Sequence, residues 1–331
     1  MGLPGVLAGL VPGEPRPETP TTSLYFASAM APHLEDGAIR RVEPNVFLAQ
    51  DKLIVMRHWS AATRRILAER PELTVIYFID DDVWSLDGEQ GLKAAYLGRL
   101  RRLAEAFDQQ LRARTIAVVS PSPRILAHFP EHETHILAPA LIHALAPLDH
   151  HDERQGPVRL VFCGTASHRS DLDRLSGILA ELLSAHARLH LTTFLGRQVP
   201  RALKLSQCTH HEPQGWALYR STLAAARFHI GLAPLAPTPF NLARSGTRLL
   251  DHAACGAAGL YSAVGPFEEL IEDGANGRLV GSGPEAWKAA ICALLEDRPL
   301  CRRLAAGGQA SAAKLGAPGR VRRFWSALLG L

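Results

Sequence analysis

Short, continuous runs of apolar and β-branched residues recur along the chain, and helical patterns lie between them. The runs at 74–79 (TVIYFI) and 116–120 (IAVVS) are the clearest. A strand that is apolar at every position is typical of a parallel sheet covered by helices on both faces, because neither face meets water. The alternation therefore predicts an α/β fold built on parallel sheets.

The alternation stops once and then restarts. A polar stretch with Pro and Gly at 150–157 (HHDERQGP) separates the two halves, and 331 residues exceed the usual size of one core. We therefore expect two Rossmann-like domains whose parallel sheets face each other across a cleft. The expected parts are a flexible Pro- and Gly-rich lead-in at 1–20, an N-terminal domain at 21–150, a C-terminal domain at 151–317 and a last helix at 318–331 that could cross back to the N-terminal domain.

Within these domains we can place the individual elements. The expected strands lie at 53–56, 74–79, 116–120, 159–164, 189–196, 228–235, 259–262 and 278–280. The expected helices lie at 58–70, 95–114, 171–186, 215–226, about 245–255, 266–274 (a short helix with a turn) and 284–297. Ligands of parallel sheets bind beyond the carboxyl ends of the strands, so the loops that follow strands are the places to search for a site.

Composition narrows the class of protein. The net charge of +4 comes from interspersed charges, which favours anionic ligands weakly and argues against a dedicated nucleic-acid binder. The five cysteines form no CxxC pair, which indicates free thiols in a reducing compartment. No stretch approaches the roughly 20 apolar residues of a membrane span, and the apolar start lacks the basic residues of a signal peptide. We expect a cytoplasmic location.

The stretch after the strand at 228–235 has the pattern of an anion site. Two prolines stiffen the loop from Ala236 to Ala243, and a helix is expected to begin near Ser245. Its first N–H groups have no partner within the helix, and small residues leave them accessible. The residues expected to bind a nucleoside diphosphate here are the small ones and their charged neighbours: Arg244, Ser245, Gly246, Thr247, Arg248 and Asp251. A capped helix with a local Arg248–Asp251 ion pair remains the alternative.

The same region carries a family resemblance. The motifs are DHAACG at 251–256 and GPFEELIEDGANGRLV at 265–280, with weaker similarity at 161–175 and 57–84. They resemble the donor-binding segment of the retaining, nucleotide-sugar-dependent glycosyltransferases of the GT-B fold (the group 1 type). The resemblance implies a GT-B architecture in which the C-terminal domain binds the nucleotide sugar and the N-terminal domain binds the acceptor.

The resemblance also assigns roles to residues. In the family a pair of acidic residues eight positions apart contacts the donor, and Asp251 takes the place of the second, which contacts the ribose. The place of the first, which contacts the sugar, falls on Ala243. Either Asn241 contacts the sugar instead, or transfer is impaired. The loop after 159–164 faces the diphosphate in relatives, which makes four residues candidates, although a plain strand-to-helix turn remains the alternative: Gly164, Thr165, His168 and Arg169.

The triplet Asp80, Asp81 and Asp82 follows another strand. Three carboxylates could hold Mg²⁺ or Mn²⁺, but the donor-like features lie in the other half of the chain. We expect no bound metal and treat the triplet as acceptor-side candidates. Alternatives left open are interdomain hydrogen bonding and a solvated loop. The fifteen histidines show no zinc-site spacing.

These observations combine into one functional hypothesis. We expect a glycosyltransferase that moves a sugar from a nucleoside-diphosphate sugar to a glycan, lipid-linked or protein acceptor, with retention and without a cofactor beyond the co-substrate. A role in surface polysaccharide or glycoconjugate synthesis fits, and the Arg-rich helical stretches could contact anionic lipid at the inner face of a membrane. No catalytic residue is assigned. The alternatives are a non-catalytic GT-B partner subunit, a sugar-nucleotide epimerase, and a metal-dependent transferase built around Asp80–Asp82.

Overall fold

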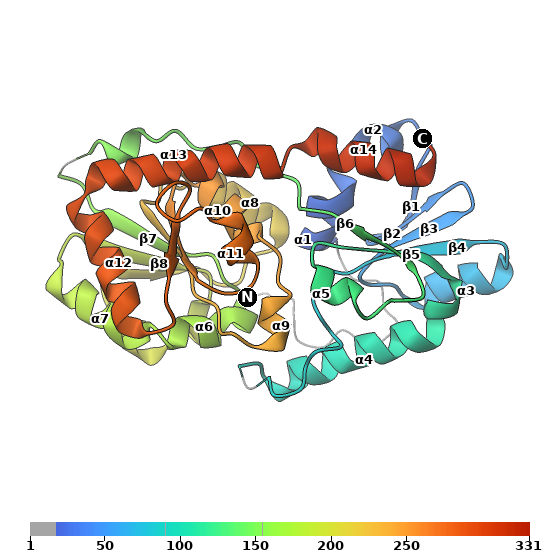
Figure 1. Cartoon of the computed structure of the whole chain (residues 1–331), viewed down its shortest axis with the longest axis horizontal. Coiled ribbons are helices and arrows are strands. Elements are labelled where there is room, and N and C mark those ends of the chain that lie inside the picture. The colour runs from blue at the N-terminus through green and yellow to red at the C-terminus, as the bar shows by residue number, and fades with distance from the viewer. Residues whose placement is uncertain (1–17, 90, 154) are drawn as a thin grey trace, which may run out of the picture.

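The computed structural model describes residues 18–89, 91–153 and 155–331, so most of the expected lead-in at 1–20 lies outside the described residues. Two six-stranded sheets form two lobes that lie side by side (Figure 1). The N-terminal lobe contains β1 (Arg40–Glu43), β2 (Val46–Ala49), β3 (Lys52–Met56), β4 (Thr74–Phe78), β5 (Thr115–Ser120) and β6 (Glu133–Ile136). The C-terminal lobe contains β7 (Val158–Phe162), β8 (Leu189–Thr193), β9 (Cys208–His210), β10 (Ile230–Ala233), β11 (Ala258–Ser262) and β12 (Arg278–Val280).

Helices fill the connections between these strands. In the first half they are α1 (Pro20–Thr22), α2 (Ala31–Glu35), α3 (Ala61–Glu69), α4 (Ala94–Gln110) and α5 (Pro123–Leu126). In the second half they are α6 (Arg169–Asp173), α7 (Ser176–Ala185), α8 (Trp216–Ala225), α9 (Pro239–Leu242), α10 (Thr247–Ala254), α11 (Pro266–Leu270), α12 (Pro284–Glu296), α13 (Arg298–Leu315) and α14 (Pro318–Leu329).

The N-terminal sheet has the sequential order β1-β2-β3-β4-β5-β6. Strands β3 to β6 are parallel, as the apolar runs predict, and β1 and β2 add an antiparallel hairpin at one edge. Side chains of β4 alternate between two cores: the ring of Tyr77 stacks on Phe107 of α4 at 4.4 Å, and that of Phe78 lies 4.5 Å from Tyr25. Each face of the sheet is therefore covered, which explains why the strand is apolar throughout.

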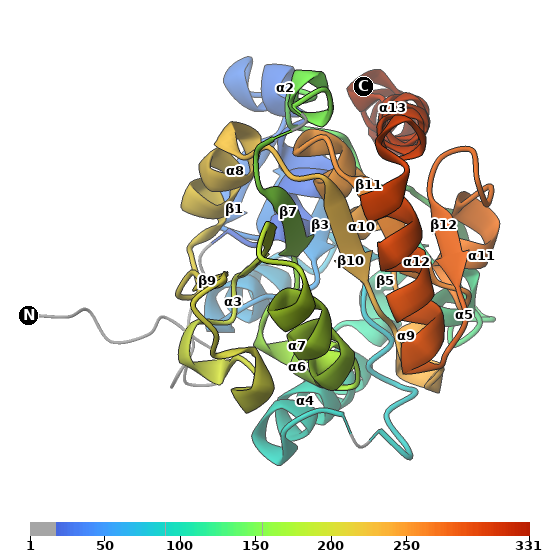
Figure 2. The same cartoon turned by 90° about the vertical axis from the view of Figure 1, so that its left-hand side faces the viewer.

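The C-terminal sheet is entirely parallel and has the order β12-β11-β10-β7-β8-β9. Helices α7 and α12 pack on one face, and α8 and α10 pack on the other (Figure 2). The strand order reverses between β7 and β10, and sheets of this kind bind ligands in the crevice beyond the carboxyl ends of such a pair. The loops that leave β7 and β10 are therefore the best placed for a site.

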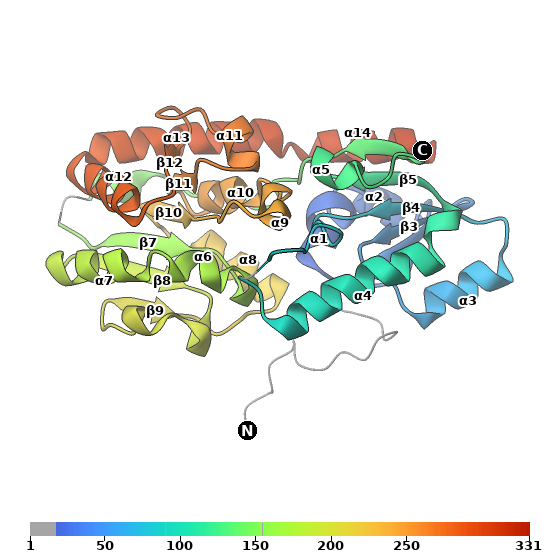
Figure 3. The same cartoon turned by 60° about the horizontal axis from the view of Figure 1, so that its bottom comes forward.

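The chain crosses between the lobes twice. The first crossing follows β6, and the second joins α13 on the C-terminal lobe to α14 on the N-terminal lobe (Figures 1 and 3). The two crossings touch where the Leu141 amide donates to the Gly316 carbonyl at 2.7 Å. A Cβ at Gly316 would lie 2.6 Å from that amide nitrogen, so the contact requires glycine. On the N-terminal lobe, Trp325 of α14 donates from Nε1 to the Tyr25 carbonyl at 2.6 Å.

In the part of the chain that the structure describes, no helix combines the length and the apolar character needed to cross a bilayer. All five cysteines are free thiols.

Candidate functional site

Loops from both lobes meet at one junction. Arg244, which follows β10 and α9 in the C-terminal lobe, forms an ion pair at 2.9 Å with Asp81, which follows β4 in the N-terminal lobe. Burial lowers the pKa of His168, in the loop after β7, and the nearby Arg244 charge lowers it further. The structure therefore brings together residues from three of the loops in which the sequence predicts a site.

The segment before α10 differs from the expectation of a plain loop. Residues Pro239–Leu242 form the short helix α9, because Pro239 occupies its first turn and the Thr238 side chain accepts a hydrogen bond from the Asn241 amide at 3.2 Å. Helix α10 then begins at Thr247 rather than near Ser245. The prediction that 236–243 is a proline-stiffened loop was wrong for this part, since the Thr-Pro pair is also a helix-start signal.

The first turn of α10 keeps its hydrogen-bond donors free. Gly246 is the N-cap residue and supplies no side-chain cap. Within the described ranges, no hydrogen bond is found for the backbone N–H groups of Ser245, Gly246 and Thr247. This end of the helix faces the N-terminal lobe, where the hydroxyl of the buried Tyr25 lies near the Ser245 side chain. Free amides and the helix dipole make this end suited to an anion.

Arg248 and Asp251 form the local ion pair that the sequence left as an alternative. Their side chains lie 2.6 Å apart, one turn along α10, and are only 20% and 10% exposed. Burial raises the pKa of Asp251, and the neighbouring Arg248 guanidinium opposes that shift. The geometry places the Arg248 guanidinium near the start of α10 and the Asp251 carboxylate further along the helix. Each of these side chains is paired with the other.

The three aspartates after β4 are not solvated. Asp80 accepts hydrogen bonds from Thr21 at 2.7 Å and from Arg57 at 3.2 Å. Asp82 pairs with His128 at 3.0 Å. Burial raises the pKa of Asp80, whereas the charges of Arg57 and Arg244 outweigh burial and hold the pKa of Asp81 below its usual range.

Arg57, which was not among the residues predicted from the sequence, completes this cluster through two ion pairs. It binds Asp81 at 2.5 Å as well as Asp80. Its φ angle is 65°, a left-handed conformation that is uncommon for a residue other than glycine. The sequence does contain a signal for this residue. Arg57 directly follows the expected strand 53–56, and ligands of parallel sheets bind at the loops that follow strands.

The loop after β7 is only partly directed to the junction. Gly164 is required by packing, since a Cβ there would lie 2.3 Å from the Phe162 ring. The pKa of His168 falls to about 4, first through burial and then through the charges of Arg244 and Arg248. Thr165 instead contacts Ser167 at 3.1 Å, and Arg169 donates to the Gln198 carbonyl at 2.7 Å. Of the candidates in this loop, His168 is thus the one on which the charges of Arg244 and Arg248 act.

Asn241 and Ala243 are both buried where the lobes meet. Ala243 is fully buried, and with Phe240 it packs into the hydrophobic core of the N-terminal lobe. Asn241 is 7% exposed, and its Nδ2 donates to the Ala236 carbonyl at 3.1 Å. Position 243 therefore serves packing between the lobes, and the Asn241 side chain is engaged within its own loop.

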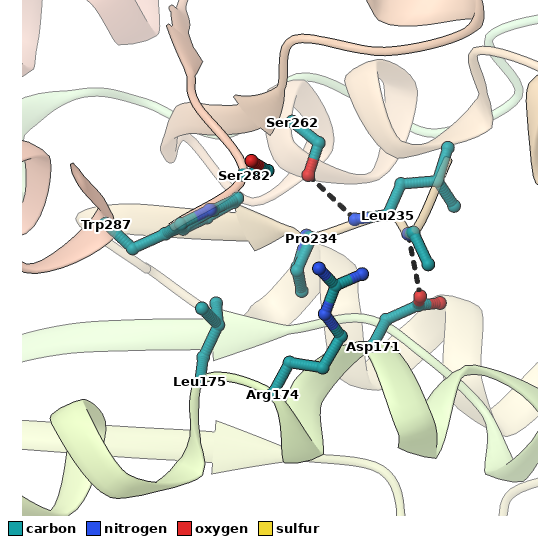
Figure 4. A pocket seen from close by; sticks show the side chains of 9 residues that line it. Asp171, Arg174, Leu175, Pro234, Leu235, Ser262, Ser282 and Trp287 are labelled. Atoms are coloured by element: carbon teal, nitrogen blue, oxygen red, sulfur yellow. Dashed lines mark hydrogen bonds between the residues drawn. The ribbon is translucent and has the colours of Figure 1, made fainter. Parts of the chain in front are cut away.

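A shallow pocket opens at the carboxyl ends of β10 and β11 (Figure 4). Its polar contacts fix the path of the chain as it leaves β10: Asp171 accepts from the Ala236 amide at 3.1 Å, and Ser262 accepts from the Leu235 amide at 2.8 Å. The pocket thus positions the loop that leads to Arg244. Among the described residues, no group of three or more His, Cys, Asp and Glu side chains is arranged to hold a metal ion.

Comparison with known proteins identifies the fold. No protein-family model matches the sequence, and no curated protein is similar to it in sequence. Sucrose-phosphate synthase from Thermosynechococcus elongatus, with two lobes of the GT-B type, matches with a TM-score of 0.57 at 14% identity, over 80% of this chain and 69% of its own. The chain has the GT-B fold.

Two further GT-B structures are similar. HepE from Anabaena, solved in complex with UDP-glucose, has a TM-score of 0.58 at 15% identity, over 81% of this chain and 75% of its own. TarM from S. aureus, solved with UDP and α-GlcNAc-glycerol, has a TM-score of 0.58 at 9% identity. The match covers 79% of this chain and 52% of TarM, so the chain spans about half of that relative.

Proposed function

We propose that this protein is a glycosyltransferase that transfers a sugar from a nucleoside-diphosphate sugar to an acceptor. The observation that carries the proposal is the start of α10. Its free N–H groups at Ser245, Gly246 and Thr247 face the other lobe beside Arg244. Such a helix start binds anions, and a diphosphate is the anion shared by these donors. Similar GT-B structures hold UDP or UDP-glucose, which supports UDP sugars as the first donors to test.

In the proposed reaction the chain itself stabilises the leaving diphosphate. The amides at the start of α10, Arg244 and Arg248 would carry the developing negative charge, which makes a metal ion unnecessary. When Arg248 turns to the diphosphate, its partner Asp251, now 2.6 Å away, becomes free to accept hydrogen bonds from the ribose hydroxyls. We propose retention of configuration, as in the enzymes that the sequence resembles.

The acceptor would enter from the N-terminal lobe. We propose a glycan, lipid-linked or protein acceptor, in the synthesis of a surface polysaccharide or glycoconjugate. Asp80 and Asp81 remain acceptor-side candidates, and they reach an acceptor only after Arg57 and Arg244 release them. Contact with anionic lipid would use exposed arginines on α4 and α14, which are Arg99, Arg101, Arg102, Arg320, Arg322 and Arg323.

A thermal-shift screen with UDP, GDP, ADP and CMP sugars tests donor binding. A ligand at 100 times its Kd stabilises the native state by about 2.7 kcal/mol, so one nucleoside-diphosphate sugar should raise the Tm. The shift should vanish in Arg248→Ala and persist in Arg322→Ala, since Arg322 is exposed on α14. A shift that survives in Arg248→Ala would place the ligand elsewhere.

A non-catalytic GT-B partner subunit is the second candidate, and the buried Ala243 favours it, because the position that carries an acid in the resembled family holds no carboxylate here. Product analysis separates the candidates. The transferase proposal predicts release of nucleoside diphosphate from the bound donor. Binding without turnover supports the partner subunit, an epimerised sugar nucleotide without acceptor supports an epimerase, and loss of turnover with EDTA supports a metal-dependent transferase.

A further inference from the structure

Arg244 connects the two lobes through a chain of ion pairs. Its Nη1 contacts Asp81 Oδ1 at 2.9 Å, and Arg57 Nη2 contacts Asp81 Oδ2 at 2.5 Å. Arg57 also contacts Asp80 at 3.2 Å. Asp81 therefore lies between two guanidinium groups, one from each lobe, and all four side chains are at most 17% exposed. An ion pair this sheltered is screened little by salt.

The charges of this cluster balance, but the hydrogen bonds of its arginines are incomplete. Two aspartates face two arginines, so the cluster is neutral. The Nε atoms of Arg57 and Arg244 are buried and have no partner among the described residues. The Arg244 guanidinium also lies over the Phe240 ring, 4.5 Å from its centroid. Arg244 is thus held in place by Asp81 and Phe240, while part of its donor capacity stays unused.

We propose that Asp81 is a latch: in the ligand-free protein it occupies Arg244 and holds the lobes together, and an incoming diphosphate displaces it. This inference rests on the proposed function, because it takes Arg244 as a ligand of the donor diphosphate. A carboxylate and a phosphate compete for the same guanidinium donors. An anion bound at the start of α10 also repels the nearby Asp81 charge, so occupation of the site weakens the contact between the lobes.

The position of the latch suits this role. The two chain crossings meet where Leu141 contacts Gly316, and α13 and α14 run along the upper edge of the molecule in Figure 1, whereas α9, which leads to Arg244, lies lower. Movement about the crossings would separate Arg244 from Asp81. A further polar contact between the lobes joins Lys93 to Gln198 at 3.0 Å and is exposed. Phe240 and Ala243 also pack into the core of the N-terminal lobe, so loss of the buried pair releases the Arg244 guanidinium and weakens the contact between the lobes, while this apolar contact remains.

Calorimetric titration of the full chain with UDP and with inorganic pyrophosphate tests the competition. Asp81→Asn keeps the shape of the side chain and removes its charge. We expect this variant to bind both anions about threefold to tenfold more tightly, which is the range that an ion pair of moderate strength corresponds to. The control is Asp87→Asn, which removes an exposed charge from the same loop and should leave both Kd values unchanged. Equal or weaker binding by folded Asp81→Asn would overturn the proposal.

Hydrogen exchange of the unmodified protein gives a readout that needs no variant. Bound pyrophosphate should speed exchange of the amides at 79–86, because the Asp81 side chain in this segment loses its contact with Arg244; slower exchange there would refute the latch. Pyrophosphate also separates the two proposals. If it binds, and binds more tightly to Asp81→Asn, while no nucleotide sugar binds, the donor proposal fails and the latch stands. If neither binds, both fail.

Discussion

At the scale of single residues, Ala243 shows whether its position at the junction of the lobes is suited to sugar contact or to packing. The resemblance places a sugar-contacting acid there, whereas the structure buries the methyl group in the core of the other lobe. Phe240 is buried in the same core, and the Arg244 guanidinium lies over its ring. The absence of an acid at this position therefore has a packing reason in this chain.

Ala243→Glu should destabilise the protein by about 3–5 kcal/mol, because it places an unpaired carboxylate in an apolar contact near Asp80 and Asp81. Urea denaturation measures the loss. Ala313→Glu, at an exposed position of α13, should change the free energy of unfolding little. Equal stability of Ala243→Glu and the unmodified protein would show that the contact between the lobes opens readily and would contradict this account.

At the scale of elements, the sequence predicts those strands that are buried on both faces. The runs at 74–79 and 116–120 match β4 and β5 to within one residue at each end. Strands β1, β6 and β9 were missed because they lie at a sheet edge, where polar residues are tolerated; β6 reads Glu-Thr-His-Ile. Strand β2 was also missed, although all four of its residues are apolar and buried. Helix α9 was missed because Pro237 and Pro239 were interpreted as residues that stiffen a loop.

The candidate site could be predicted only in part, for a related reason. The motifs identify Arg244, Arg248 and Asp251 as residues of one segment, since spacing along a helix fixes which side chains are neighbours. Contacts between segments, such as Arg57 with Asp81 within the N-terminal lobe and Arg244 with Asp81 across the lobes, depend on how the strands and the lobes pack. The spacing of residues along the chain does not determine these contacts, so the proposed latch is inferred from the structure.

Three histidines join the linker between the lobes to the C-terminal sheet. The rings of His150 and His151 lie 4.2 Å apart, and that of His229 lies within 5.3 Å of both. Nε2 of His151 bonds the Gly256 carbonyl at 2.8 Å. Burial, followed by neighbouring positive charge, lowers the pKa of His229 to about 2; burial also lowers that of His151 to about 4. These rings are therefore neutral in the folded protein.

Stability should fall as the pH falls from about 6.5 toward 4. In this window the unfolded chain binds protons at His151 and His229 that the folded chain excludes. The stabilisation from these neutral histidines is therefore complete above pH 6.5 and is lost below it, by up to about 1.4 kcal/mol per pH unit for each histidine. Urea denaturation at several pH values measures the slope. In His151→Gln, whose amide can still reach Gly256, the slope of the free energy of unfolding against pH should decrease by the contribution of one proton. An unchanged slope would contradict the assignment of this pH dependence to His151.

At the scale of the whole molecule, the fold places the start of α10, the proposed diphosphate site, where two lobes meet that are joined along one edge. The neighbours of GT-B fold support this architecture at identities of 9–15%, and the crossings at Leu141 and Gly316 hold the lobes in register. A donor that binds at α10 would thus contact one lobe through its diphosphate and meet the acceptor held by the other.

A crystal structure of the protein with UDP tests this central claim most directly. The account predicts that the phosphate oxygens lie within hydrogen-bond distance of the Ser245, Gly246 and Thr247 amides and of Arg244 or Arg248, with Asp251 on the ribose and Asp81 withdrawn from Arg244. UDP bound away from the start of α10, for example in the pocket lined by Asp171 and Trp287, would contradict it.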